Sequence, residues 1–329
     1  MLDNNSKAEN RGHLVRYGHE DVLKILSKKH GEKFDRYREA WKNAELKQIV
    51  ADNPLYIELG INSDCNLRCK MCARSYDNEY NNKHENISLE LVDKIVEQCE
   101  KFNLPAILVG QDSECLLHPK FKQIIGKLKK INCVDFFVIT NGTLLTRDIS
   151  EFLIEMDIDR LQISIDAAKP ETYKKIRGGN LKILEKNIND FLELRKKAQK
   201  NTPILRVSFC EQSDNEDEKE EFKKKWENKA DIVDFQKFID LSSVVNLEEK
   251  KQKKEYFCPD PFQRIVIDYK GNMYGCCCMG YNRYFKLGNL DSITIMEAWN
   301  SDRMVQLRNS FLTQNLNNVC LNCRAGIEG

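Results

Sequence analysis

The sequence predicts an α/β protein built on a partial (β/α)6 barrel, with a helical extension before it and a small α+β module after it. Short runs rich in β-branched and aromatic residues alternate with longer segments of helical periodicity, which is typical of βαβ units and a parallel sheet. The cysteines also form separate groups near residue 70 and after residue 257. A chain of 329 residues has room for more than one domain.

The extension covers residues 1–50 and is predicted to be helical. Apolar residues recur at helical spacing in 21–27, and Phe34, Tyr37 and Trp41 continue a second amphipathic pattern. We interpret this segment as an additional packing layer. A lid over a substrate is the alternative interpretation.

The barrel is predicted within residues 51–245. The expected strands are 55–60, 106–110, 135–140, 160–165, 204–209 and 232–238, and helical patterns at 89–102, 119–130, 146–156 and 181–199 lie between them. Chemistry on parallel barrels gathers at the carboxyl ends of the strands. Residues that directly follow a strand are therefore candidates for a site.

The C-terminal module is predicted within residues 246–329. It opens on a polar linker or exposed helix at 248–255, followed by a β-hairpin that turns at residues 270–272 and a helix over 295–311. The cysteines of this segment are its main chemical feature.

Composition limits the partners and the setting. Lys and Arg number 52 against 51 Asp and Glu, a net charge of +1, so no nucleic acid or anionic membrane is expected as a partner. The sequence has no long apolar run and no signal-peptide pattern, so we expect a cytoplasmic protein. Thirteen cysteines in a reducing compartment favour metal ligation or catalysis over disulfides.

A cysteine triad follows the first predicted strand. Cys65, Cys69 and Cys72 form a Cys-x3-Cys-x2-Cys run. Three thiolates can hold an iron–sulfur cluster and leave one iron open to a small molecule. Half of a zinc site and ordinary buried cysteines are the alternatives, although zinc ligands usually come as Cys-x2-Cys pairs.

This run resembles the cluster motif of the radical S-adenosylmethionine (SAM) superfamily. The resemblance implies a 4Fe-4S cluster on the triad and SAM bound to its open iron. It also implies a 5′-deoxyadenosyl radical that takes a hydrogen atom from the substrate, and flavodoxin or ferredoxin as the electron donor.

Residues at the strand ends match other parts of the family's SAM site. The segment 110–119 occupies the place of the glycine-rich loop, with Asp112 and Ser113 where glycines are usual and Cys115 where proline is usual. Arg177 matches an arginine that often pairs with the SAM carboxylate. Ordinary turn chemistry is the alternative for the Asn-Gly and Gly-Gly pairs at 141–142 and 178–179. The resemblance implies SAM contacts from Met71, Asp112, Ser113, Glu114, Asn141, Ser164, Asp166 and Arg177.

The C-terminal cysteines resemble those of the SPASM/twitch auxiliary-cluster domain in its single-cluster form. The spacing is similar to that of a radical SAM dehydrogenase acting on an aminocyclitol. The implied ligands of a second, closed 4Fe-4S cluster are Cys258, Cys276, Cys320 and Cys323. Cys277 or Cys278 could replace Cys276, and a structural zinc site is the alternative.

Together these features predict a radical SAM oxidoreductase acting on a small polar substrate, namely a sugar, cyclitol or nucleotide sugar. Dehydrogenation is expected if the second cluster accepts the remaining electron. Epimerisation is the alternative, with Cys210 or Cys115 returning a hydrogen atom, although burial without a role also explains both cysteines. A peptide substrate is a third hypothesis, less favoured because residues 1–50 show helical patterns but no clear β-wing of a leader-binding module. Candidates for polar contacts with the substrate include Glu58, Arg206, Gln236 and Lys237. Each is explained equally well as a barrel residue whose hydrogen bonds are satisfied within the protein.

Overall fold

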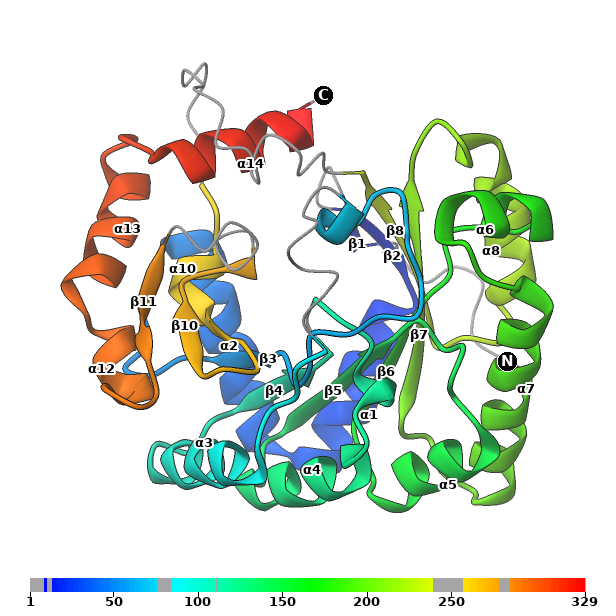
Figure 1. Cartoon of the computed structure of the whole chain (residues 1–329), viewed down its shortest axis with the longest axis horizontal. Coiled ribbons are helices and arrows are strands. Elements are labelled where there is room, and N and C mark those ends of the chain that lie inside the picture. Colours follow the sequence, from blue (N-terminus) through cyan, green and yellow to red (C-terminus); the bar gives the residue numbers. More distant parts are fainter. Residues whose placement is uncertain are drawn as a thin grey trace. The chain divides into compact units, whose positions relative to one another are not determined.

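The computed structural model describes residues 9–10, 14–75, 84–110, 112–238, 257–277 and 285–328 (Figure 1). The chain divides into two compact units whose segments alternate along the sequence. The first unit contains residues 1–31, 65–71 and 134–238, and the second contains residues 32–64, 72–133 and 239–329.

The first unit is organised around a sheet of mostly parallel strands. Its order is β1-β2-β8-β7-β6-β5, with parallel pairing from β5 to β8 and antiparallel pairing of β2 with β8 and with β1. The bounds are β1 (Glu9–Asn10), β2 (Leu14–Tyr17), β5 (Asp135–Thr140), β6 (Arg160–Ser164), β7 (Ile204–Glu211) and β8 (Ile232–Lys237).

Helices of the first unit cover one face of this sheet. They are α5 (Arg147–Glu155), α6 (Pro170–Arg177), α7 (Leu181–Lys197) and α8 (Lys219–Trp226) (Figure 1). Phe222 of α8 packs on Phe209 and Phe235, with ring centroids 4.9 and 5.8 Å away. Because side chains alternate along a strand, Cys210 and Asp234 lie on the opposite face.

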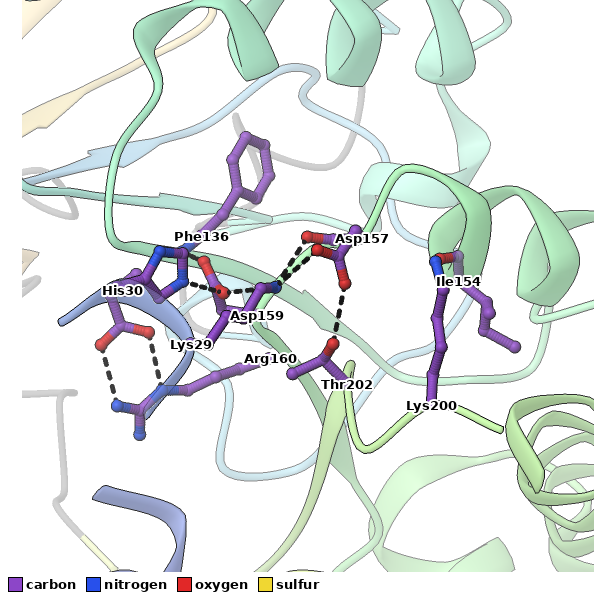
Figure 2. A network of polar contacts seen from close by, with 10 residues as sticks. Lys29, His30, Phe136, Ile154, Asp157, Asp159, Arg160, Lys200 and Thr202 are labelled. Atoms are coloured by element: carbon purple, nitrogen blue, oxygen red, sulfur yellow. Dashed lines mark hydrogen bonds and ion pairs between the residues drawn. The ribbon is translucent and has the colours of Figure 1, made fainter. Parts of the chain in front are cut away.

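Helix α1 (His19–His30) is attached to the amino ends of β5 and β6. Asp159 accepts hydrogen bonds from Lys29 Nζ at 2.8 Å and from Phe136 N at 2.8 Å, and lies 2.6 Å from His30 Nε2. Figure 2 shows Asp159 among these partners. Arg160 beside it pairs with Asp135 through two bonds of 2.7 and 2.8 Å. The carboxylates of Asp135 and Asp159 are buried, so these contacts replace the water that the charges lose.

The strands of the second unit are hydrogen-bonded in the order β4-β3-β9-β10-β11. Both β4 and β9 run parallel to β3, whereas β10 is antiparallel to β9 and to β11. The strands are β3 (Tyr56–Leu59), β4 (Ala106–Val109), β9 (Arg264–Ile267), β10 (Asn272–Tyr274) and β11 (Lys286–Asn289). Its helices are α2 (Glu32–Lys47), α3 (Leu89–Lys101), α4 (Phe121–Leu128), α10 (Asp260–Gln263), α12 (Ile295–Trp299), α13 (Asp302–Leu312) and α14 (Asn318–Glu328).

The predicted α/β class and the six predicted strands are confirmed within the described residues, and four features differ in detail. The N-terminal extension is not wholly helical, because β1 and β2 precede α1. Helix α6 is an additional element. The helix expected over 295–311 is interrupted where Ser301 caps α13 through the N–H of Met304. The hairpin of the C-terminal module does not stand alone, because β9 pairs with β3. The predicted linker 248–255 lies outside the described residues, and the domain boundaries stay predictions.

Candidate functional site

The cysteine loop of the first unit is held by hydrogen bonds to its backbone and its sulfurs. Lys70 N–H donates to the carbonyl of Ile176 at 2.9 Å. Arg177 Nη1 donates to the sulfur of Cys69 at 3.6 Å. Burial raises the pKa of the Cys69 thiol, and the charge of Arg177 opposes that rise. Cys65, Cys69 and Met71 are half-buried, so the sulfurs are neither sealed in the core nor fully in water.

Asn141 combines a turn with a contact to the cysteine loop. Its side-chain oxygen accepts the N–H of Thr143 at 2.9 Å, and its side-chain nitrogen donates to Asn66 at 2.9 Å and approaches the sulfur of Cys65 at 3.9 Å. The next residue, Gly142, has φ +72, and a Cβ there would lie 2.5 Å from Leu184. Turn chemistry and proximity to the triad therefore occur in the same residues.

Asp166 and Arg177 form a buried ion pair after the carboxyl end of β6. Arg177 Nε donates to Asp166 Oδ2 at 2.7 Å, and its Nη2 contacts the same oxygen. Asp166 has φ +64. Ser164, two residues earlier, is half-buried and lies opposite Ser208 in the sheet register.

Cys210 lies near the carboxyl end of β7, on the sheet face opposite α8. Its backbone N–H donates to Asp166 Oδ1 at 2.7 Å. Burial raises the pKa of its thiol well above the usual value, and the charge of Asp166 adds to the effect. The sulfur is therefore an S–H group rather than a thiolate near neutral pH.

The loop that matches the glycine-rich segment lies in the second unit. Asp112 has φ +63, a left-handed conformation that Asp adopts more readily than most residues, so it can follow a glycine-like backbone path. Ser113 Oγ donates to Asn62 at 2.5 Å. Glu114 is buried and caps the 3-10 helix Cys115–Leu117 through the N–H of Leu116. Asp112 and Ser113 are half-buried, which leaves them better placed than Glu114 to meet a ligand.

The other candidate residues have structural partners. Cys115 is fully buried. Arg206 forms an ion pair with Asp234. Glu58 accepts a 2.8 Å bond from Tyr56 and pairs with Arg264. Gln236 is half-buried and Lys237 is exposed.

Cysteines of the C-terminal module lie close enough in the second unit to influence one another's pKa values. Burial raises the pKa values of the Cys258, Cys276 and Cys320 thiols, that of Cys320 to about 12. Neighbouring thiols raise these pKa values further. Cys323 raises the pKa of Cys258 and of Cys320, and Cys258 and Cys320 raise the pKa of Cys276. Cys277 is close to Cys276 and Arg264, and Cys278 lies outside the described residues.

These donors fit soft metal ions or iron–sulfur clusters. Four close thiols can bind as thiolates in a closed site, and N–H groups directed at Cys65 and Cys69 suit sulfurs that carry negative charge. Among the described residues, no three His, Cys, Asp or Glu side chains already form a group that could hold a metal ion. The ligand assignment therefore rests on cysteine spacing and on the proximity of the thiols. No helix within the described parts is long and apolar enough to cross a membrane.

Comparison with protein-family models gives two matches. A model described as the Radical SAM superfamily matches residues 61–222. A second, described as the SPASM iron–sulfur cluster-binding domain, matches residues 258–324.

Curated relatives cover different shares of the chain. A probable GTP 3′,8-cyclase of Methanococcus maripaludis is 33% identical over 137 residues, which is 41% of this chain and 45% of that protein, less than half its length. The tungsten-containing aldehyde ferredoxin oxidoreductase cofactor-modifying protein of Pyrococcus furiosus is 24% identical over 316 residues, covering 82% of this chain and 86% of that protein.

Solved structures share the fold. BtrN in complex with AdoMet and 2-DOIA is 17% identical with a TM-score of 0.56, over 82% of this chain and 92% of that chain. Native anSMEcpe with bound AdoMet is 18% identical with a TM-score of 0.60, over 83% and 89%. SuiB of Streptococcus suis, bound to the precursor peptide SuiA, is 13% identical with a TM-score of 0.60, over 84% and 70%. At these identities the likeness concerns the fold alone.

Proposed function

Because this chain belongs to the radical SAM superfamily and carries a SPASM iron–sulfur domain, we propose that it is a SAM-dependent oxidoreductase that dehydrogenates a small polar substrate. Sugars, cyclitols and nucleotide sugars are the substrate classes we favour. The electron donor would be a flavodoxin or a ferredoxin.

In this proposal the triad cysteines bind the first cluster, and nearby polar residues bind SAM or orient the cysteine loop. Cys65, Cys69 and Cys72 would hold the first 4Fe-4S cluster, which with bound SAM supplies a hydrogen-abstracting radical. Asp112 and Ser113 would contact the methionine part of SAM, because half-buried oxygens on a left-handed backbone turn can meet an ammonium group. Asn141 would orient the loop that carries Cys65.

The gathering of four thiols in the C-terminal module is the observation that carries the proposal. Cys320 and Cys323 raise the pKa of the Cys258 thiol, and Cys258 and Cys320 raise that of Cys276, so these thiols lie near one another. Four thiolates complete a cluster without an open iron. A closed cluster is suited to accept an electron rather than to bind a substrate. This favours a net two-electron oxidation.

Cys210 supports epimerisation as a second candidate. Its pKa is raised by burial, so the thiol keeps the hydrogen atom that an epimerase must return to the substrate. It also lies near a strand end, where barrel chemistry gathers. Cys115 is a weaker candidate because it is fully buried.

The N-terminal segment supports a small substrate over a peptide. Strand β2 pairs with β8 over four residues, and α1 is bonded to Asp157 and Asp159. Residues 14–30 are therefore bonded to the strands and loops of the first unit, which supports a small substrate over a peptide held by a separate N-terminal module. A peptide remains the competing substrate class for the test below.

The deciding experiment is anaerobic incubation of the purified protein with SAM and a chemical reductant. Deuterated sugars and cyclitols form one set of candidates, and deuterated peptides form the other. We expect deuterium to enter 5′-deoxyadenosine from a sugar or cyclitol, which identifies the substrate and the abstracted position together. Transfer from peptides alone would contradict the proposed substrate class.

Cys210→Ala separates the two candidate reactions. A dehydrogenase keeps its turnover in this variant, whereas an epimerase stalls after hydrogen abstraction. Iron and acid-labile sulfide should be counted first, with about eight irons per chain expected for two 4Fe-4S clusters. A purified protein that contains zinc and no sulfide would contradict the proposed radical SAM activity.

A further inference from the structure

The guanidinium of Arg177 uses all three of its nitrogens on two partners. Nε and Nη2 contact Asp166, and Nη1 donates to the sulfur of Cys69 at 3.6 Å. Arg177 is the last residue of α6, and Gly178 follows it in a left-handed conformation that ends the helix. The Arg177 side chain is only 11% exposed. Its position is therefore set by these two contacts and by the end of the helix.

Asp166 is anchored independently of Arg177. Its side-chain oxygen Oδ1 accepts the N–H of Cys210 at 2.7 Å, and its carbonyl accepts from Asn215 Nδ2 at 2.8 Å. Its own N–H donates to the carbonyl of Ser208 at 3.2 Å. A non-glycine residue at φ +64 persists only where its surroundings fix it. These contacts fix the position of the Asp166 carboxylate at the carboxyl ends of β6 and β7.

The cysteine loop is attached to α6 by bonds that do not involve Arg177. Lys70 N–H donates to Ile176 O at 2.9 Å. Asp214 also binds Lys70 at 2.7 Å and Lys175 at 2.6 Å. The loop should therefore stay in place when Arg177 is replaced, so the contact with the sulfur can be tested without unfolding the loop.

We propose that Asp166 is a positioning residue that holds the Arg177 guanidinium against the Cys69 sulfur, and that this contact raises the reduction potential of the triad's cluster. The inference rests on the proposed function, since it assumes a cluster on the triad. Hydrogen bonds to cluster sulfurs tune reduction potentials. An N–H donor and a positive charge both stabilise the reduced cluster, which carries one more negative charge.

This role differs from the one implied by family resemblance, in which Arg177 pairs with the SAM carboxylate. Here the carboxylate partner of Arg177 is Asp166 of the same chain. The two roles predict different measurements. Loss of a SAM contact weakens SAM binding, whereas loss of a sulfur contact moves the potential even without SAM.

The test is a redox titration of the reconstituted full-length protein, followed by electron paramagnetic resonance without SAM. The signal that changes when SAM is added identifies the triad cluster. The variants are Arg177→Gln, Arg177→Lys and Asp166→Asn. The matched controls are Asp135→Asn and Arg160→Gln, which break another buried pair of the same unit, about 13 Å along β6 from its carboxyl end.

We expect Arg177→Gln to shift the potential to more negative values and Arg177→Lys to shift it less. Asp166→Asn should also shift it to more negative values, because the freed guanidinium leaves the sulfur. If Asp166 acted only as a charge, removing it would shift the potential to more positive values, which would overturn the positioning role. Both controls should match the wild type.

An unchanged potential in Arg177→Gln, together with SAM binding weakened tenfold or more, would overturn the inference in favour of the SAM contact. If Arg177→Gln retains fewer than about eight irons, Arg177→Lys and Asp166→Asn decide the question. A wild type that holds zinc and no sulfide would instead refute the proposed function. If the wild type holds two clusters and the Arg177 and Asp166 variants have the same reduction potential as the wild type, only this inference is refuted.

Discussion

Two buried aspartate–arginine pairs lie at opposite ends of the parallel strands in the first unit. At the amino ends, both oxygens of Asp135 bind Arg160, and the guanidinium stacks on Phe137 at 4.7 Å from the ring centroid. At the carboxyl ends, one oxygen of Asp166 binds Arg177 and the other accepts a backbone N–H.

The difference lies in how each carboxylate is shared. A carboxylate that gives both oxygens to one guanidinium forms a complete fork, and the remaining face of that guanidinium packs on an aromatic ring. A carboxylate that divides its oxygens holds the guanidinium from one side and leaves Nη1 for the Cys69 sulfur. The same two residue types therefore serve stability at one end of the sheet and a candidate site at the other.

Removing a cysteine of the triad, near the carboxyl ends of the strands, should have the strongest consequence. Replacing Cys69 by Ala removes one ligand of the triad, so the iron content should fall from about eight to about four per chain and SAM cleavage should be lost. Iron and sulfide counting checks this outcome. Cys133→Ala is the matched control, since Cys133 is a half-buried cysteine outside both ligand groups, and it should keep all the iron. Equal iron in Cys69→Ala would refute the ligand assignment.

Removing a carboxylate at the amino ends of the strands should lower stability but leave the iron content unchanged. Asp135→Ala leaves the Arg160 charge buried without its partner, which costs about 3–5 kcal/mol of unfolding free energy. Urea unfolding should show this loss while the iron content stays unchanged. Asp157→Ala is the comparison variant, because that carboxylate is 45% exposed, and it should cost clearly less. A loss of iron in Asp135→Ala would show that the two ends are not separate in function.

The contribution of Asp159, at the amino ends of the strands, to stability should depend on pH. Burial alone raises the pKa of Asp159, but the hydrogen bond with His30 and the charge of Lys29 outweigh it, so the pKa lies below its usual value. A carboxylate with a depressed folded-state pKa stabilises the fold above its unfolded pKa and loses that contribution as the pH falls. Wild-type stability should therefore decrease below roughly pH 4.

Asp159→Asn tests the source of that decrease. The variant should be less stable at neutral pH, and its stability should change less steeply between about pH 4 and pH 2, since one titrating carboxylate is gone. Thermal unfolding across this range measures both slopes. Parallel curves for the two proteins would contradict the contribution of Asp159.

The smallest effect concerns a helix cap near the carboxyl end. Thr146 caps α5 by accepting the N–H of Ile149, so Thr146→Ala should cost about 1 kcal/mol. Ser88→Ala removes the corresponding cap of α3 in the second unit and should cost about as much. Urea unfolding measures both values. A loss of iron in Thr146→Ala alone would show that the turn at Asn141 depends on the cap.

The local pattern predicts the parallel strands well because each is a short apolar run between helices. Strand β2 could not be predicted in this way. Its four residues extend only because the edge of β8 offers them partners more than two hundred residues away. Helix α6, by contrast, has local signals, with Pro170 in its first turn and Gly178 after its end.

In the candidate site, too, the sequence predicts some features and not others. The cysteine spacing predicts the ligand groups, and the resemblance points to Asp166 and Arg177 separately. Their contact with each other and with Cys69 depends on where α6 ends relative to the cysteine loop. That is a matter of tertiary packing, which the local periodicity of the sequence does not predict. Asp112 stands where the family usually has a glycine, and its positive φ shows that Asp can adopt the backbone conformation that glycine would provide there.

The pairing of β9 with β3 has a consequence for truncation. β3 has β4 on one side and β9 on the other, and the Gly60 N–H just beyond it donates to the carbonyl of Ile267 at 2.9 Å. A chain cut after Phe238 would lose β9 and expose the N–H and C=O groups along that side of β3. Exposed strand edges promote association with other chains. The C-terminal module therefore also shields a sheet edge, and a truncated barrel is expected to aggregate whether or not it binds iron.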